Sequence, residues 1–209
     1  MTQTTTQATN PDVAVGAYGW EHKHWQGHYY PDDLPEGWQL GYYSNDFNAV
    51  LVPAADLAAN LAGEQPLPVE DWPDEVHENF RFYIECNAVL LETAGPEVLI
   101  ERLGSLQSQL AALVVVGGNS LSDAQAVSLQ ALSGTLSAPL YIAGNSSDIV
   151  LLDSELKDLR QVRAQIEPFL QQLENRSQAE APAAVFVRHP KLQATDLGRF
   201  RAMLEMMGY

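Results

Sequence analysis

The strongest constraint on the fold is a regular alternation between short apolar runs and longer segments with helical periodicity. Strands buried on both faces of a parallel sheet form continuous apolar runs, whereas half-exposed antiparallel strands alternate apolar and polar residues. The pattern therefore predicts a parallel sheet covered by helices. The predicted strands are 13–20, 48–52, 80–86, 113–116, 140–143, 148–152 and 184–188. The predicted helices are 38–47, 54–62, 73–78, 97–112, 122–132, 154–175 and 197–207.

Six or seven strands fit either a β/α barrel or a doubly wound open sheet. No change of composition divides the chain, and its 209 residues are enough for one domain with a full hydrophobic core. We therefore expect a single domain at 13–209. Residues 1–12 are polar and contain no apolar run, so they predict a disordered tail and not a secretory signal.

The formal charge of −16 is carried almost entirely by one half of the chain. Residues 1–100 contain 16 acids and 2 bases (net −14), whereas residues 101–209 contain 11 acids and 9 bases (net −2). Because an acidic surface repels phosphate groups, neither nucleic acid nor a membrane is an expected partner. No apolar run approaches the roughly 20 residues of a membrane span. The single cysteine, Cys86, excludes an intrachain disulfide, favours a cytoplasmic location and is expected to be a buried, inert thiol.

Residues 14–53 concentrate side chains that can both pack and bind, with three of the four tryptophans, three of the five histidines and five of the eight tyrosines. His22, His24 and His28 could together bind zinc. Their spacing is not that of a common ligand pair, and no clustered carboxylate or cysteine completes the set. A structural or surface role is therefore favoured, and no metal or cofactor is predicted.

Four aromatic residues of the same stretch, Trp20, Trp25, Tyr29 and Tyr30, could form the floor of a site for a sugar or a base, because flat rings offer stacking area. Aromatic side chains more often build cores. Packing of the loop and of one barrel end is therefore the favoured interpretation.

Several short motifs in the first half of the chain resemble the YecE-like family, also called domain of unknown function 72. That family begins with a GTSGW strand, followed by W-x-G, FYP and LP motifs and an F-N-x-V-E-x-N strand. The corresponding motifs here are GAYGW (16–20), WQG (25–27), YYP (29–31), LP (34–35) and FNAV (47–50), and FRFYI (80–84) is similar to a later family strand. The resemblance implies a TIM-like β/α barrel with fewer strands than the usual eight.

The chain departs from the family pattern where its strands end. Leu51 and Pro53 stand where the family has a glutamate and an asparagine, and Glu85 stands where it has a lysine. The family's FQLPP strand end is replaced by VVGGN (115–119). Residues at the carboxyl ends of barrel strands line the pocket. The resemblance therefore implies that the barrel scaffold is retained, whereas most of the family's polar pocket is lost.

The candidate site residues lie at or just after the carboxyl ends of predicted strands, where barrel sites form. Glu85 and His24 are the candidate catalytic acid and base, although a lone strand-end carboxylate is more often a capping or ion-pairing group. The candidate substrate-binding residues are Trp20, Asn119, Asn145 and Arg188.

Two functions remain open from the sequence. The favoured one is a non-catalytic binding or scaffold protein with a degenerate pocket, whose acidic half faces a protein partner. The other is an enzyme that acts on a small anionic or sugar-like substrate. Fold analogy cannot choose between them, and the sequence does not indicate the oligomeric state.

Overall fold

A computed structural model describes residues 13–116, 121–144, 148–174 and 183–209. The predicted tail at 1–12 lies outside these residues. Seven parallel strands pair in the order β5-β4-β3-β2-β1-β7-β6 within the described part of the chain. The strands are β1 (Val13–Tyr18), β2 (Ala49–Val52), β3 (Arg81–Cys86), β4 (Leu110–Val115), β5 (Leu140–Ile142), β6 (Ile149–Leu152) and β7 (Ala183–Val187).

The sheet curls into a nearly closed barrel. Neighbouring strands follow chain order around the ring, and β7 returns to pair with β1. The two ends of the sheet approach each other, because the amide of Gly144, just after β5, donates to the carbonyl of Ile149 in β6 (3.1 Å). The predicted α/β class, a TIM-like barrel with an incomplete set of strands, is confirmed.

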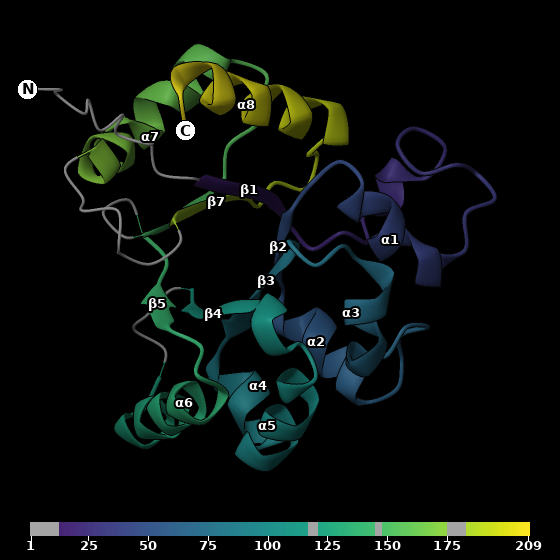
Figure 1. Cartoon of the computed structure of the whole chain (residues 1–209), viewed down its shortest axis with the longest axis vertical. Helices are drawn as coiled ribbons and strands as arrows, with labels where there is room; N and C mark the ends of the chain where they lie inside the picture. The colour runs from purple at the N-terminus through teal and green to yellow at the C-terminus, as the bar shows by residue number, and fades with distance from the viewer. Residues whose placement is uncertain (1–12, 117–120, 145–147, 175–182) are drawn as a thin grey trace, which may run out of the picture.

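Helices surround the strands, with α7 and α8 on one side of the barrel and α2, α4, α5 and α6 on the opposite side (Figure 1). The helices are α1 (Gln39–Ser44), α2 (Ala54–Leu61), α3 (Trp72–Glu75), α4 (Ala88–Ala94), α5 (Pro96–Gly104), α6 (Asp123–Leu136), α7 (Leu159–Glu174) and α8 (Ala194–Met207). Short 3-10 helices lie at Lys23–Trp25, Glu36–Trp38, Val69–Asp71 and Gln107–Gln109. None of the described helices has the length and apolarity that crossing a membrane requires.

The bore of the barrel is a packed core. Strand residues point alternately into the bore and toward the helices. The fully buried bore residues are Ala49, Leu51, Tyr83, Ala112, Val114, Ile149, Ala184 and Phe186. Gly16 of β1 permits the closest approach, because a methyl group there would lie 2.1 Å from the carbonyl oxygen of Ala49 and 3.1 Å from the ring of Phe186. Side chains thus fill the bore, as in other small barrels.

Two predicted helices differ most from the structure in their limits. The helix expected at 97–112 ends at Gly104, because Gln107 adopts a positive φ of 48°, and the chain then enters β4 at Leu110. The helix expected from Ser154 begins only at Leu159, where the carboxylate of Asp158 accepts the amides of the first turn. Helix α4 was not predicted. Helix α6 begins at a capping box that Ser122 forms with Gln125.

Candidate functional site

The carboxyl ends of the strands form the mouth of the barrel, and Glu85 of β3 is the buried charged group there, with 7% of its surface exposed. Its Oε2 accepts a hydrogen bond from the Tyr18 hydroxyl (2.5 Å) and another from the backbone amide of Ala54 (2.9 Å). Ala54 is the first residue of α2, directly after Pro53. Glu85 therefore caps the N-terminus of α2, where a free amide and the helix dipole both favour a negative charge.

Tyr18 connects Glu85 to Arg188. The guanidinium carbon of Arg188 lies 5.6 Å from the centre of the Tyr18 ring, within cation–π range. Arg188 also binds Asp153 in a bidentate manner, with Nε to Oδ1 at 2.7 Å and Nη2 to Oδ2 at 3.0 Å, and this hydrogen bonding raises the pKa of Arg188. Burial, and next the bond to Glu85, raises the pKa of Tyr18, so the phenol remains a proton donor. We call Glu85, Tyr18, Arg188 and Asp153 the mouth cluster.

Two further carboxylates, Asp56 and Glu21, interact electrostatically with Glu85 and with each other. Burial and then the negative charge of Glu85 raise the pKa of Asp56, and burial and then Asp56 raise the pKa of Glu21. The cleft beside them holds about 10 Å³, and it is lined by Trp20, Glu21, Val52, Asp56, Asn60, Gln65 and Trp72. That volume admits about one water molecule. The cleft is therefore too small for an organic substrate.

The aromatic residues of the first loop pack against each other and against the barrel. Trp25 and Tyr30 are 0% and 1% exposed, and Trp20 (7% exposed) meets Trp72 edge-to-face at 5.1 Å. The hydroxyl of Tyr30 donates to the carbonyl of Trp20 (2.8 Å). These rings act as core residues, as the packing interpretation predicts, and offer little open face to a sugar or a base.

His24 is engaged away from Glu85. Its Nε2 lies 2.6 Å from the carbonyl oxygen of Leu192, which also accepts the indole N–H of Trp25 at 2.6 Å. The neighbouring His22 packs on Trp25 with ring centres 4.3 Å apart, and burial lowers its pKa to about 4. His24 and Trp25 thus tie the first loop to the segment before α8 through the carbonyl of Leu192. Among the described residues, no three histidine, cysteine or acidic side chains group closely enough to hold a metal ion.

Of the six candidate residues, the structure brings Glu85 and Arg188 to the same cluster. Trp20 and His24 have other partners, and Asn119 and Asn145 lie outside the described residues. Sequence reasoning missed Tyr18 and Asp153. Both end barrel strands, Tyr18 as the last residue of β1 and Asp153 directly after β6, so strand-end position was the signal that could have identified them.

A larger cleft of about 530 Å³ opens in the first loop, lined by Glu21, His22, Lys23, Gln26, Leu34, Pro35, Glu36 and Gln39. The side-chain amides that line this cleft already form hydrogen bonds within the protein. Gln26 donates to the carbonyls of Pro31 and Asp32 (2.7 and 3.0 Å), and Gln39 donates to Gln26 (3.3 Å). The cleft therefore has the size of a ligand site but few unengaged amide groups to orient a ligand.

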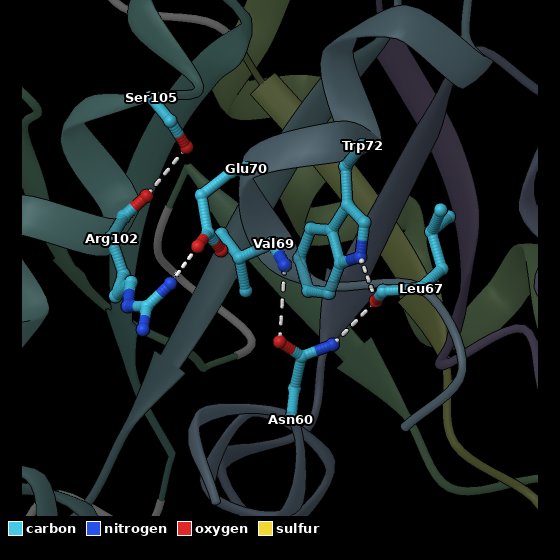
Figure 2. A network of polar contacts seen from close by, with 7 residues as sticks. All are labelled: Asn60, Leu67, Val69, Glu70, Trp72, Arg102 and Ser105. Carbon is cyan, nitrogen blue, oxygen red and sulfur yellow. Dashed lines mark hydrogen bonds and ion pairs between the residues drawn. The ribbon is translucent and has the colours of Figure 1, made fainter. Parts of the chain in front are cut away.

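A second kind of candidate site is the acidic segment, residues 64–78, which holds six exposed acids and no lysine or arginine. Figure 2 shows how this segment is anchored to helices α2 and α5. The Asn60 side chain donates to the carbonyl of Leu67 (2.7 Å) and accepts the amide of Val69 (3.1 Å), while the Trp72 indole also donates to Leu67 (3.1 Å). Glu70 forms an ion pair with Arg102 of α5. The acids are thus presented on a fixed backbone.

Comparison with known proteins identifies the family. The family model described as "Protein of unknown function DUF72" matches residues 14–209, nearly the whole chain. No curated protein and no solved structure matches the chain. The matched region begins in β1 and ends after α8, so it includes every strand of the barrel and the mouth cluster. The chain therefore belongs to the family of proteins of unknown function DUF72.

Proposed function

We propose that this protein is a non-catalytic binding protein, in which the barrel is a scaffold and the acidic surface binds a basic region of a protein partner. The observation that carries the proposal is the internal engagement of the mouth cluster. Glu85 is bound by Tyr18 and by the amide of Ala54, and Arg188 is bound by Asp153. A catalytic acid or anion-binding cation needs access to its substrate, whereas these groups stabilise each other.

The residues that depart from the family pattern support the same conclusion. Leu51 is fully buried in the bore, Pro53 precedes the first turn of α2, and Glu85 accepts the amide of Ala54 in that turn. Each of the three side chains therefore has a structural role that depends on its neighbours. Strand ends whose polar groups bind one another suit a scaffold better than a ligand pocket.

The acidic segment supports a partner of basic chemistry. Within the described residues, Glu70 is the acid of this segment that forms an ion pair, and the other five acids form none. Unpaired surface charges of one sign steer an oppositely charged partner and raise its association rate. The anchoring by Asn60 and Trp72 keeps the segment ordered, which lowers the entropy cost of binding.

A binding measurement with an octalysine peptide tests the proposal. The test variant combines Asp71→Asn and Asp74→Asn in the acidic segment, and the control combines Glu155→Gln and Glu205→Gln, which changes the net charge equally at acids outside that segment. We expect fluorescence anisotropy at about 50 mM salt to show about tenfold weaker binding for the test variant and less than about twofold for the control. An equal loss of affinity in the two variants, or an affinity that does not change with salt concentration, would contradict a localised acidic site.

The alternative is an enzyme acting on a small anionic or sugar-like substrate at the barrel mouth. One observation favours it: Arg188 keeps 38% of its side chain exposed beside Glu85 and Tyr18, so an anion could replace Asp153. A panel of sugars and sugar phosphates assayed with wild-type protein and with Glu85→Gln separates the two functions. Turnover that is lost in Glu85→Gln would establish the enzyme and overturn the binding proposal.

A further inference from the structure

Trp38 is the tryptophan that the fold leaves exposed to solvent. Trp20, Trp25 and Trp72 are at most 7% exposed, and each lies against another aromatic ring. Trp38 is 65% exposed, although it directly precedes α1, which is bonded to the barrel. A lone exposed apolar side chain is common on protein surfaces, so its meaning depends on its neighbours.

The residues on both sides of Trp38 lie against the acidic segment, and Figure 1 shows α1 next to α3 of that segment. A methyl group on Gly37 would lie 3.9 Å from the Cβ of Pro66. One on Gly41 would lie 3.2 Å from the carbonyl oxygen of Glu75 and 3.4 Å from its Oε2. Trp38 already has helical backbone angles, so Gly41, three residues later, is its neighbour on the helix surface. Trp38 therefore borders the acidic segment close to the Glu75 carboxylate.

The charges around Trp38 are mostly negative. Glu36 is exposed two positions before it, and Glu75 forms no ion pair within the described residues. The cleft of about 530 Å³ that Glu36 helps to line contains two acids and one base, Lys23. Residues 24–80 contain no lysine or arginine. A cation that approaches Trp38 is therefore attracted by Glu36 and by Glu75.

We infer that Trp38 and Glu75 form a subsite for an arginine side chain of the basic partner. A guanidinium group is planar, so it can stack on an indole ring while its N–H groups donate paired hydrogen bonds to a carboxylate. Tryptophan is the aromatic side chain that attracts such a cation most strongly. A lysine ammonium is a strongly hydrated point charge and gains less from either contact. The inference rests on the proposed function and deepens it, because it specifies which basic residue the acidic surface recognises.

Both members of the subsite are held in place before a partner binds. Trp38 stands at the start of α1, which Tyr43 fixes to the barrel. The Tyr43 hydroxyl accepts the amide of Ala17 and donates to the carbonyl of Ala49, at 2.9 Å each. Glu75 belongs to the acidic segment, which is anchored by hydrogen bonds to α2. Binding therefore does not have to order either backbone, which lowers its entropy cost.

A comparison of octaarginine with octalysine tests the inference. We expect wild-type protein to bind octaarginine at least about fivefold more tightly in fluorescence anisotropy at about 50 mM salt. Trp38→Ala should weaken octaarginine binding about five- to tenfold and octalysine binding less than about twofold. Trp38→Phe keeps a ring and should lose less. The control is Val89→Ala on α4, an equally exposed apolar residue (64%) outside the acidic segment, which should leave both affinities unchanged.

Tryptophan fluorescence gives a second readout that reports contact with the ring itself. Acrylamide is an uncharged quencher that reaches exposed rings, so the quenching of wild-type protein should come mainly from Trp38. Bound octaarginine should protect the protein from this quenching. The protection should be absent in Trp38→Phe, whose remaining tryptophans are buried. Circular dichroism confirms that each variant is folded before its binding is measured.

The possible failures of the two proposals are distinguishable. Equal weakening of both peptides by Trp38→Ala, or octaarginine binding without protection from acrylamide, would overturn the arginine subsite and leave the binding of a basic partner intact. Absence of binding by both peptides to wild-type protein would overturn the proposed function, and the subsite with it. Selective loss of octaarginine binding in a folded Trp38→Ala variant supports the subsite.

Discussion

Replacing Glu85 by alanine tests whether the mouth cluster stabilises the fold or serves chemistry. The substitution removes the single oxygen that accepts both the Tyr18 hydroxyl and the Ala54 amide. Tyr18 is partly exposed and can bond water instead, but Ala54 is 2% exposed and its amide would be left without an acceptor. An unsatisfied buried amide costs about 1–3 kcal/mol. The lost charge at the N-terminus of α2 adds about 0.3–1 kcal/mol.

The expected loss of unfolding free energy is therefore about 1–4 kcal/mol for Glu85→Ala. Glu85→Gln is the matched control, because its amide oxygen can still accept both hydrogen bonds while its charge is removed. We expect it to cost less than about 1 kcal/mol. Urea unfolding followed by circular dichroism measures both variants. With an m-value of about 2–3 kcal/mol/M, the alanine variant should lose about 1 M in its midpoint, with m unchanged.

The opposite result would refute the structural role of Glu85. A carboxylate that is buried for chemistry is a burden on the fold, so its removal raises stability. An unchanged or higher midpoint for Glu85→Ala would therefore show that the two hydrogen bonds contribute little, and it would favour the enzyme over the scaffold.

Three substitutions and one chemical modification test the packing further. Gly16→Ala should cost about 3 kcal/mol or more in urea unfolding, because its methyl group would meet the backbone of β2, whereas Gly198→Ala, with nothing within 4 Å, should gain about 0.5–1 kcal/mol in α8. Asp56→Asn should raise the melting temperature at pH 7, because burial and the charge of Glu85 raise the pKa of Asp56, so that its ionised form destabilises the fold. The gain should disappear below the unfolded-state pKa of about 4, where Asp56 is protonated in both the folded and the unfolded protein. Cys86 should resist a disulfide reagent at pH 8 until the protein unfolds, because burial raises its pKa to about 12 and leaves fewer than about one thiol in a thousand ionised.

The sequence was sufficient for the strands and for the parallel sheet, because burial on both faces requires continuous apolar runs. It was insufficient for the helix expected at 97–112. Leu99, Leu103, Leu106 and Leu110 keep a helical spacing across the break at Gln107, where the backbone has a positive φ. A glutamine in that conformation carries no signal in the sequence, since glycine and asparagine are its usual occupants.

The candidate site could be predicted from the sequence only in part. Barrel geometry alone places Glu85 and Arg188 at the strand ends, so both could be named from strand positions. Tyr18 and Asp153 also stand at strand ends, but their contacts could not be predicted, because the register between β1 and its neighbours decides that Tyr18 lies between Glu85 and Arg188. His24 was paired with Glu85 on sequence grounds, and the structure instead places its Nε2 next to Leu192, a contact across 168 positions of the chain. Contacts of that range depend on the complete fold.

The weakest packing in the described part of the barrel lies in α6 and β5, and this has a measurable consequence. Helix α7 buries five residues, whereas the 14-residue α6 fully buries two, and β5 is the shortest strand with three residues. Elements with few buried contacts open locally at low free energy. Amide hydrogen exchange in α6 and β5 should therefore be faster than exchange in α7. Exchange in α6 as slow as exchange in α7 would show that the few buried contacts of α6 do not lower its local stability, and it would refute this reasoning.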